Sequence, residues 1–295
     1  MTGWRILDLS HFEGSVRVTR GAVEIRGQRI PVADVDLMLM GPKAHFGGAL
    51  VHRAAGAQTS VIVCDWKHEP VAAMYPWSSN TRVGARQLAQ AEMTRPRKKN
   101  GWMRIVKAKV RSQENTLLFA ERFEAAERLR ALSTRVRSGD PQNIEAQAAR
   151  VYWQAMYGAD GFTRVPGAED AVNAAHNYGY TVLRGIVLSA VVAAGLNPTL
   201  GMHHRGRGNV FALVDDLIEP FRCIVDRVII ADPELREDFP HADARRALVD
   251  RILARASAAG EPQDGKGPAA QIRDFVQSYA GYVEGEADVL AVPVM

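Results

Sequence analysis

Cysteine is scarce in this chain of 295 residues, which contains two of them. Cys64 and Cys223 each lie within an apolar run, so we expect two small buried thiols rather than a disulfide. Neither cysteine belongs to a pair with the spacing of metal ligands. This usage argues against a disulfide-stapled scaffold and a cysteine zinc site, and it favours the reducing environment of the cytosol.

Long apolar segments are missing as well. The longest, residues 182–196, contains Arg184 and is shorter than the roughly 20 residues that a membrane-spanning helix needs. Met1 is followed by Thr, Gly, Trp and Arg rather than by the apolar stretch of a secretion signal. We therefore expect a cytoplasmic protein with no membrane association.

The chain also lacks a large excess of charge of one sign. Its 37 Lys and Arg residues exceed its 33 Asp and Glu residues by a formal charge of +4, which alone is a weak sign of nucleic-acid binding. The positive charge is concentrated, however, because Arg97, Lys98 and Lys99 form a block and more basic residues follow up to Arg111. Such a block is typical of a phosphate-binding surface and equally of a solvated helix face.

The first 78 residues alternate between short apolar runs and turn signals, which is typical of β-structure. We expect strands over residues 5–9, 15–19, 21–25, 29–32, 35–40, 60–64 and 71–77, and a helix over residues 45–58. The polar run Ser78, Ser79 and Asn80 ends this region, so we place a domain boundary there.

From residue 81 onward the pattern becomes helical. We expect helices over residues 82–94, 102–137, 142–157, 168–194, 210–218, 220–230, 233–258 and 268–282. Asn143 is suited to cap the third of these helices, and Gly195 ends the fourth. The sequence thus predicts an α+β fold, with a small β-rich N-terminal domain over residues 1–78 and a larger all-α catalytic domain over residues 79–295.

Three acidic residues, Asp215, Asp216 and Glu219, lie within one apolar run. On a helix, Glu219 shares a face with each aspartate, and close carboxylates repel one another unless a cation compensates them. A divalent metal is one such cation, and Pro220 would break the helix and expose carbonyl groups beside Glu219. The alternative, which is the commoner case, is an acidic helix face paired with arginines.

A double histidine lies upstream of the acidic run, since His203 and His204 are followed by Arg205 and Arg207. One imidazole and two or three carboxylates, counting the more distant Glu145, suit a divalent metal that accepts nitrogen and oxygen ligands. Arginine binds phosphate through two parallel hydrogen bonds. A loop histidine is more often a surface or core residue, but the combination points to metal-dependent chemistry on a nucleic acid.

Five segments resemble a known family when they are taken in this order. They are Asn-Ile-Glu-Ala at 143–146, Asp-Ala-Val-Asn-Ala-Ala at 170–175, Asn-Tyr-Gly-Tyr-Thr-Val-Leu at 177–183, Gly-Leu-Asn-Pro at 195–198 and the acidic run at 211–222. Together they resemble the first-numbered CRISPR-associated (Cas) protein, the endonuclease and integrase of spacer acquisition, over nearly the whole chain. Residues 61–70 and the basic block at 95–99 look most like members from type II systems.

The resemblance implies a metal site made of a glutamate, a histidine and an acidic residue. Carried onto this chain, these are Glu145, His204 and Glu219, and Asp216 is a candidate accessory ligand. His204 is preferred to His203 because its distance to Glu219 fits the family spacing better, and His203 would instead orient a carboxylate or contact DNA. The ion would be Mg²⁺ or Mn²⁺, since a histidine joins the oxygen ligands.

The resemblance also implies an activity and partners. A 3′-hydroxyl of a short DNA duplex would attack a phosphodiester at the CRISPR repeat, a transesterification that needs no protein nucleophile. Homodimers, formed through the β-rich domain, would join the small second-numbered Cas protein in a heterohexamer that holds double-stranded DNA. The expected contacts to the DNA backbone are Arg205, Arg207, Arg97, Lys98 and Lys99.

Two other functions are compatible with the same residues. The chain could be a non-catalytic DNA-binding scaffold of the adaptation complex, in which the ligands are structural. It could also be a nuclease that cuts branched DNA, because the same chemistry proceeds with water as the nucleophile.

Two further segments carry structural expectations. The polar residues within 170–180 are interpreted as a hydrogen-bonded network behind the site, because polar groups buried on an apolar helix need partners. Residues 288–295 are expected to form a loose tail, and residues 289–295 are apolar enough to dock on a partner.

Overall fold

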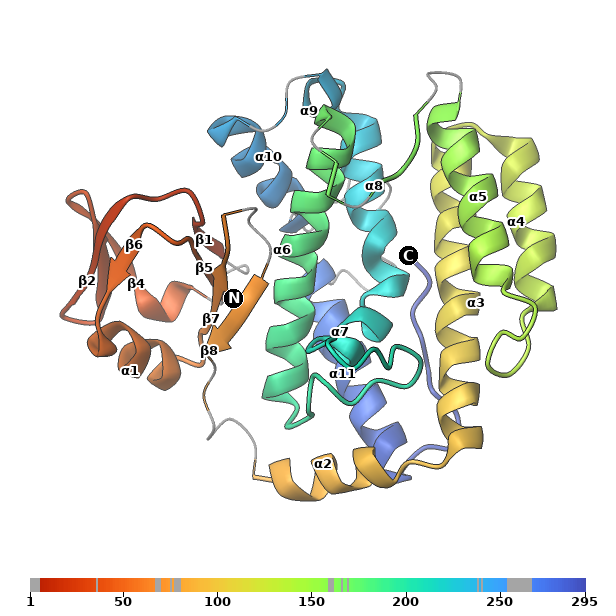
Figure 1. Cartoon of the computed structure of the whole chain (residues 1–295), viewed down its shortest axis with the longest axis horizontal. Helices are drawn as coiled ribbons and strands as arrows, with labels where there is room; N and C mark the ends of the chain where they lie inside the picture. Colours follow the sequence, from red (N-terminus) through yellow and green to blue (C-terminus); the bar gives the residue numbers. More distant parts are fainter. Residues whose placement is uncertain are drawn as a thin grey trace.

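The computed structural model describes residues 6–35, 37–66, 70–74, 76, 81–158, 162–165, 167–168, 170–237, 239, 241–253 and 267–295. Figure 1 shows a small β-rich part, at the left, beside a larger bundle of helices. This arrangement confirms the predicted α+β fold. The predicted boundary at residues 78–80 lies outside the described residues and stays a prediction.

Two four-stranded sheets make up the N-terminal part. In the first, of order β1-β5-β7-β8, the strands Ile6–Leu9, Leu37–Met40 and Ser60–Cys64 run parallel and Pro70–Met74 returns antiparallel. The second, of order β4-β3-β2-β6, is built from Gln28–Pro31, Ala22–Ile25, Gly14–Thr19 and Ala44–Phe46. The predicted hairpin is confirmed as β3–β4, whose turn places Arg26 and Gly27 at positive φ.

Side-chain alternation in β5 divides its apolar residues between two cores. Leu37 and Leu39 pack with the helices, whereas Met38 and Met40 pack in the N-terminal core with helix α1 (Gly48–Gly56). All four side chains are at most 1% exposed. Because the strand is buried on both faces, it appears in the sequence as a continuous apolar run rather than as an alternating pattern.

Helix α6 (Ala171–Ala193) is the central helix, and it packs on the first sheet (Figure 1). Gly185 permits the close approach, because a Cβ atom there would lie 2.8 Å from Leu37 Cδ2. The carboxylate of Asp170 accepts a hydrogen bond from the backbone N–H of Asn173 and caps the first turn. The helix ends before Gly195, whose φ is +74°, as predicted.

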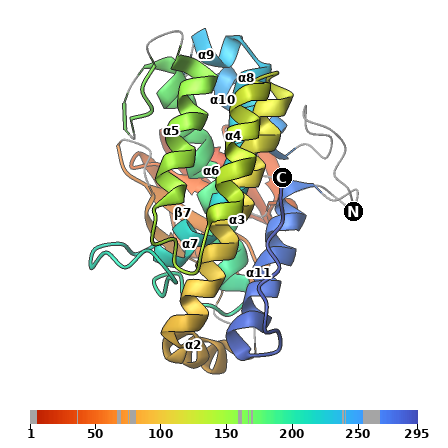
Figure 2. The ribbon, with the colours of Figure 1, turned by 90° about the vertical axis from the view of Figure 1, so that its right-hand side faces the viewer.

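The other helices lie around α6 and along α3 (Figures 1 and 2). They are α2 (Val83–Glu92), α3 (Arg95–Phe119), α4 (Phe123–Arg135), α5 (Ile144–Tyr157), α7 (Ala212–Leu217), α8 (Arg222–Ala231), α9 (Glu234–Glu237), α10 (Ala242–Leu253) and α11 (Pro268–Glu284), with the 3₁₀ turn η3 (Glu219–Phe221) between α7 and α8. No helix among the described residues combines the length and the apolar character that crossing a membrane requires.

The single helix expected over residues 102–137 is wrong, because α3 and α4 form an antiparallel hairpin. The chain reverses at Glu121, which has a φ of +58°. The backbone N–H of Arg122 bonds to Leu117 O, and that of Glu121 bonds to Leu118 O, which is the Schellman pattern of a helix end. Glycine usually fills the left-handed position, and its absence here removed the signal from the sequence.

The predicted cap of α5 is also wrong. Asn143 precedes the helix but has a left-handed φ of +50°, and its side chain makes no capping hydrogen bond. Asp140 supplies the cap instead, because its two carboxylate oxygens accept from the N–H groups of Ile144 and Glu145 at 2.9 Å each. The aspartate thereby fixes the turn of α5 that carries Glu145.

Several element boundaries differ from the prediction. Residues 45–58 begin with β6 before α1, and residues 233–258 divide into α9 and α10. Pro96 lies in the first turn of α3, where a missing N–H costs nothing, rather than ending α2. The last predicted strand is shorter than expected, and Trp77 lies outside the described residues.

The C-terminal segment is docked on the chain rather than loose. Leu290 is 1% exposed, and the backbone N–H of Met295 donates to Ser112 Oγ at 2.9 Å. Met295 O accepts from Arg227 at 2.7 Å and from Asn115 at 2.9 Å. The segment runs beside α3 (Figures 1 and 2), where Leu290, Val292 and Met295 pack against the core of the helical part. Val289 and Val294 remain about half exposed, so the docking of this segment on a partner stays a prediction.

Candidate active site

Two acidic residues far apart in the sequence meet at one lysine. Glu145 lies in the first turn of α5, Glu219 begins η3, and Lys109 lies in the middle of α3. Lys109 Nζ is 2.6 Å from Glu145 Oε1 and 2.6 Å from Glu219 Oε2. Three separate helical segments therefore bring the two predicted ligand carboxylates to one point.

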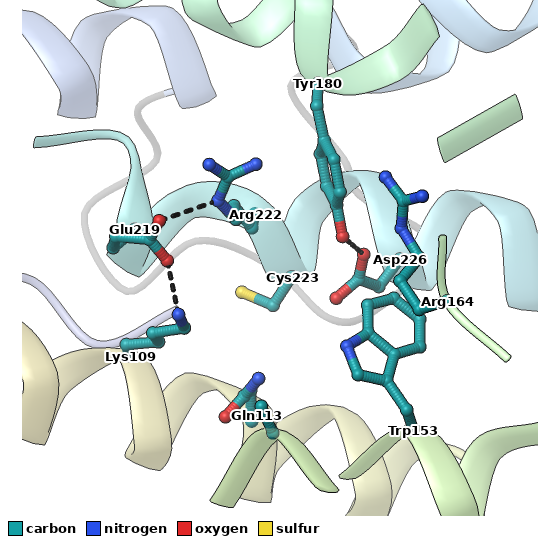
Figure 3. Close-up of a pocket in the computed structure, with 10 residues that line it drawn as sticks. Lys109, Gln113, Trp153, Arg164, Tyr180, Glu219, Arg222, Cys223 and Asp226 are labelled. Carbon is teal, nitrogen blue, oxygen red and sulfur yellow. Dashed lines mark hydrogen bonds and ion pairs between the residues drawn. The ribbon is translucent and has the colours of Figure 1, made fainter. Parts of the chain in front are cut away.

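Glu219 is buried, and two cations hold its ionised form. Arg222 Nε donates to Oε1 at 3.0 Å, and Lys109 lies against Oε2 (Figure 3). Burial opposes ionisation, but Arg222 and Lys109 outweigh it and lower the pKa of Glu219 to about 2. Burial likewise opposes the charge of Lys109, yet Glu219 and Glu145 raise the pKa of Lys109 above its usual value. Glu219 and Lys109 are therefore charged at neutral pH.

Asp216 organises the turn that carries the histidines. Its carboxylate is fully buried and accepts hydrogen bonds from the backbone N–H groups of Met202, His203 and His204. It also lies 2.7 Å from His204 Nδ1, and this bond raises the pKa of His204 although burial opposes the shift. Gly201 allows the close fit, because a Cβ atom there would lie 2.9 Å from Asp216 Oδ2. With Nδ1 bonded, Nε2 is the nitrogen that His204 can offer to a ligand.

The imidazole of His203 has a different environment. It stacks on the indole of Trp102, with ring centroids 4.1 Å apart and planes 6° apart, while Trp102 meets the ring of His204 edge to face at 5.8 Å. His203 contacts Asp216 through its backbone N–H rather than through the ring. The indole of Trp102 thus packs against the rings of both histidines.

Asp215 does not join the carboxylate pair. Arg184 Nε donates to its Oδ1 at 3.0 Å, and Asn209 Nδ2 donates to Oδ2 at 2.9 Å. For this residue the alternative interpretation, an acidic side chain paired with an arginine, describes the structure.

The basic block does not act as one surface, because Arg97 has an internal role. Its Nε and Nη2 donate to Tyr282 O at 3.0 and 2.6 Å, and its guanidinium lies 4.1 Å from the centroid of the Tyr282 ring. Arg97 thereby ties the start of α3 to the end of α11, which the sequence did not indicate.

The other predicted DNA contacts lie at the surface. Lys99, Arg205 and Arg207 are exposed, and Lys98 is half-buried. Burial and the nearby charge of Arg205 lower the pKa of Lys98. Lys98 of α3 and Arg205, which follows His203 and His204, thus lie close enough for their positive charges to repel each other. An anion bound between them would remove this repulsion.

A cavity of about 250 Å³ opens beside Glu219 (Figure 3). Its lining includes Lys109, Gln113, Trp153, Arg164, Tyr180, Glu219, Arg222 and Asp226. We call it the Glu219 cavity. Of these residues, sequence reasoning identified Glu219 alone as functional. The spacing of three residues between Glu219 and Arg222 could have indicated their pairing, whereas nothing in the sequence connects Lys109 with Glu145.

The predicted polar network behind the site is confirmed. Tyr152 and Tyr180 donate their hydroxyl hydrogens to the buried carboxylate of Asp226, the former at 2.7 Å. Arg164 donates to Asn173 Oδ1 at 2.9 Å and to Asn177 Oδ1 at 2.7 Å. Tyr180 of α6 is therefore satisfied by α8, and Asn173 and Asn177 by the segment before α6, whereas the buried Nε2 of His176 lies 3.6 Å from Asp226 Oδ1 without a well-formed hydrogen bond.

The carboxylates of Glu145 and Glu219 and the imidazole of His204 are donors of the kind that a divalent cation binds, although they do not converge on one point in this structure. Among the described residues, no three His, Cys, Asp or Glu side chains converge closely enough to hold an ion. The ammonium of Lys109 lies between the two carboxylates instead. Glu219 Oε2 is buried without a well-formed hydrogen bond, so a cation alone compensates it. Two carboxylates and an imidazole suit Mg²⁺ or Mn²⁺ once the ammonium is displaced.

The site combines two carboxylates around a cation, a histidine bonded to a third carboxylate, and exposed arginines, on a fold in which a β-rich part packs on helices. This arrangement is the one expected of a protein that acts on phosphodiesters. The comparison with protein families specifies the class further, because the model of the family described as CRISPR associated protein Cas1 matches residues 9–237. The chain belongs to this family.

One relative is the CRISPR-associated endonuclease Cas1 of Neisseria meningitidis serogroup C (strain 8013), which is 36% identical over 202 residues. The alignment covers 68% of this chain and 66% of that protein, so the chain matches just under two-thirds of the length of this relative.

Solved structures share the fold. A casposase bound to integration product superposes with a TM-score of 0.71 at 18% identity, over 98% of this chain and 92% of that chain. A Cas6-RT-Cas1–Cas2 complex superposes with a TM-score of 0.78 at 17% identity, over 100% of this chain and 36% of that chain. At these identities the likeness establishes the fold alone.

Proposed function

We propose that this chain is a divalent-metal-dependent DNA endonuclease and integrase of CRISPR adaptation. It joins the 3′-hydroxyl ends of short DNA fragments to the CRISPR repeat by transesterification. The observation that carries the proposal is the convergence of Glu145 and Glu219 on one cationic centre, near enough to His204 for the charge of Glu219 to raise its pKa. Membership of the Cas1 family and the fold shared with a casposase bound to integration product support it.

Glu145, Glu219 and Nε2 of His204 would hold the ion, either Mg²⁺ or Mn²⁺. When bound, the ion polarises the phosphodiester and stabilises the leaving oxygen. Asp216 acts as a positioning residue rather than as an accessory ligand, because both of its oxygens are already bonded to the histidine loop. It fixes the orientation of the His204 ring through Nδ1. The attacking group is a DNA hydroxyl, so no side chain needs to act as a nucleophile.

The exposed cations around the site would bind the DNA backbone. Lys98 and Arg205 repel each other, and a phosphate placed between them removes this cost. Lys99 and Arg207 are exposed cations that adjoin Lys98 and Arg205 in the sequence, and we include them among the proposed backbone contacts. Contacts of this kind make binding salt-dependent and largely independent of sequence. Arg97 supports the surface indirectly, by fixing α3 against α11.

The proposed assembly is a homodimer formed through the N-terminal domain that joins Cas2 in a heterohexamer on double-stranded DNA in the cytoplasm. One structural neighbour is a complex of Cas1 with Cas2, and another is bound to an integration product, which supports Cas2 and DNA as partners.

A strand-transfer assay tests the proposal. The purified chain and its Cas2 partner are incubated with a labelled short duplex and a supercoiled plasmid that carries the repeat, in Mn²⁺, Mg²⁺ or EDTA. We expect label in the plasmid with either ion and none with EDTA. Nicking without transfer of label would instead indicate a nuclease, for which branched and linear DNA are then compared as substrates.

The second candidate function is a non-catalytic DNA-binding scaffold. The observation that favours it is the position of Lys109, whose ammonium, together with the guanidinium of Arg222, already neutralises the carboxylate pair without a metal. A scaffold binds DNA tightly in EDTA and transfers no strand in any divalent ion.

Lys109→Met separates these possibilities by metal binding. Methionine keeps the length of the side chain and removes the charge that competes with the ion, so we expect the variant to bind Mn²⁺ about tenfold more tightly. In EDTA the variant is less stable by roughly 3 kcal/mol, because Glu219 and Glu145 then face each other with their shared cation removed. Calorimetric titration with Mn²⁺ and thermal unfolding with and without the ion measure both effects.

Lys107→Met is the matched control, since Lys107 lies on the same helix two residues away and is partly exposed. Its affinity for Mn²⁺ and its stability should equal those of the wild type. Equal Mn²⁺ affinity in Lys109→Met and in the wild type would contradict a metal site between Glu145 and Glu219.

A further inference from the structure

Helix α2 contributes one buried side chain to the structure, and that side chain is polar. Within Val83–Glu92, all of which the structure describes, Gln90 is the only buried residue, whereas Leu88 is 59% exposed. The helix lies across the C-terminal end of α6 (Figure 1). Surface helices are usually held in place by an apolar stripe, so a helix whose one buried contact is an amide has another reason for its position.

Both ends of the Gln90 amide bond to one turn of the backbone. Nε2 donates to Asn197 O and to Leu200 O, and Oε1 accepts from the backbone N–H of Asn197, each at 2.9 Å. These groups lie between α6 and the histidines, in the segment 195–200, which belongs to no helix or strand. Because the backbone groups of a loop need partners as those of a helix do, the amide fixes the conformation of this turn.

Arg86 holds the other end of the same segment. It lies one turn before Gln90 on the same face of α2, and its Nη1 donates to Ala194 O at 2.6 Å. Its Nε donates to Glu284 of α11 at 3.0 Å. The chain from Ala194 to Leu200 is therefore held at both ends by α2, and α2 itself is held by α11.

The turn that Gln90 holds is also bonded to the start of α7. The backbone N–H of Leu213, in the first turn of that helix, donates to Pro198 O at 2.8 Å. Helix α7 carries Asp216, and η3 with Glu219 follows it. Gln90 therefore fixes the turn against the segment that carries two acidic residues of the site.

The chain then enters the loop of the histidines without slack. Gly201 follows Leu200, and a Cβ atom at Gly201 would lie 2.7 Å from His204 O and 2.9 Å from Asp216 Oδ2. A backbone packed this closely transmits a shift instead of absorbing it. Movement of Leu200 away from α2 would therefore move the His204 ring, which is four residues further along.

We infer that Gln90 is a positioning residue of the proposed metal site, an inference that rests on the proposed function. Through the turn at residues 197–200, it sets where the His204 ring lies relative to the carboxylates of Glu145 and Glu219. The turn is partly exposed, so water could bond to its backbone groups if the amide were absent. Gln90 is therefore needed for the geometry of the site rather than for the fold.

A double-mutant cycle on the affinity for Mn²⁺ tests this inference. The full chain is titrated calorimetrically with Mn²⁺ as the wild type, Gln90→Met, His204→Ala and the double variant, each well below its melting temperature. Methionine keeps the approximate volume of glutamine and removes its donors and its acceptor. We expect Gln90→Met to raise the Kd for Mn²⁺ about tenfold in the wild-type background, and less than about twofold in the His204→Ala background, where no imidazole remains to be positioned.

Two further variants keep the test valid. Gln87→Met is the matched control, since Gln87 is a half-buried glutamine on the same helix, and its Kd and melting temperature should equal those of the wild type. Gln90→Met should lower the melting temperature by no more than a few degrees, because water replaces the amide. If it folds poorly, Gln90→Glu replaces it in the cycle, because the carboxylate can accept from the Asn197 N–H but repels the two carbonyl oxygens.

An equal rise of Kd in both backgrounds would overturn the inference, because Gln90 would then act on the carboxylates or on the fold as a whole. An unchanged Kd in Gln90→Met, or failure of both Gln90 variants to fold, would overturn it as well, and each of these results leaves the proposed function intact. Absence of Mn²⁺ binding by the wild type, or wild-type affinity in His204→Ala, would overturn the proposed metal site and the inference with it.

Discussion

Replacing Glu145 by glutamine is expected to lower the rate of strand transfer by about a thousandfold while leaving the protein folded. The substitution removes one of the two carboxylates that would hold the ion, and metal stabilisation of the reacting phosphate contributes several kcal/mol, with tenfold in rate for each 1.4 kcal/mol. The side chain is 23% exposed, and the glutamine Oε1 can still accept from Lys109. The loss is therefore one of chemistry rather than of stability.

Initial rates at saturating Mn²⁺, measured beside thermal unfolding curves, check this expectation. Glu124→Gln is the control, because the Glu124 side chain is 83% exposed and its ion pair with Arg128 lies at the surface. It should change neither quantity. A Glu145→Gln variant that retains more than about a tenth of the wild-type rate would remove Glu145 from the proposed metal site.

The charges of the site explain why a metal would change its behaviour. Glu145 and Glu219 carry two negative charges, and Lys109 and Arg222 carry two positive ones, so the cluster has no net charge as it stands. A neutral cluster attracts a phosphodiester weakly. A divalent ion that displaces the Lys109 ammonium leaves a surplus of positive charge beside the bound DNA, which binds the phosphate and its developing charge more strongly.

Much of the fold could be predicted because local signals agreed with it. The hairpin of β3 and β4, the buried strands β5 and β7 and the end of α6 at Gly195 all follow from patterns within a few residues. The helix break at Glu121 could not be predicted, because it depends on how α4 packs on α3 and not on a glycine or proline. Asp140 was overlooked as a cap for a similar reason, since it lies four residues before the helix that it caps.

In the candidate site, too, some residues could be predicted from the sequence and others could not. Glu145, His204 and Glu219 were indicated by the resemblance to a family, and the short spacing of Glu219 and Arg222 carries its own signal. Lys109 could not be found, because a lysine in a basic helix gives no sign that its end is buried between two carboxylates. Trp102 gives no sign of its role under the histidines either, since an apolar residue on a helix is most simply a core residue.

The second large effect is expected for Asp216→Asn. The aspartate accepts from the backbone N–H groups of Met202, His203 and His204 and from His204 Nδ1. Asparagine presents an NH₂ group to some of these donors, so N–H groups face each other in a buried position and the charge is lost. We expect a loss of about 3 kcal/mol in the free energy of unfolding, which corresponds to a fall of roughly 6 °C or more in melting temperature.

The same substitution should also lower strand transfer by about tenfold to a hundredfold at a temperature where the variant is folded, because the partner of a metal-binding histidine sets the orientation of its ring. Asp243→Asn, at an exposed position of α10, is the control for both measurements. Stability and strand-transfer rate, measured together, distinguish an Asp216 that orients the His204 ring for the reaction from one that only stabilises the fold. A variant that is destabilised but, once folded, transfers strands at the wild-type rate would mean that His204 does not need Asp216 for catalysis. A variant with normal stability would contradict the buried bonds from the loop that carries the histidines.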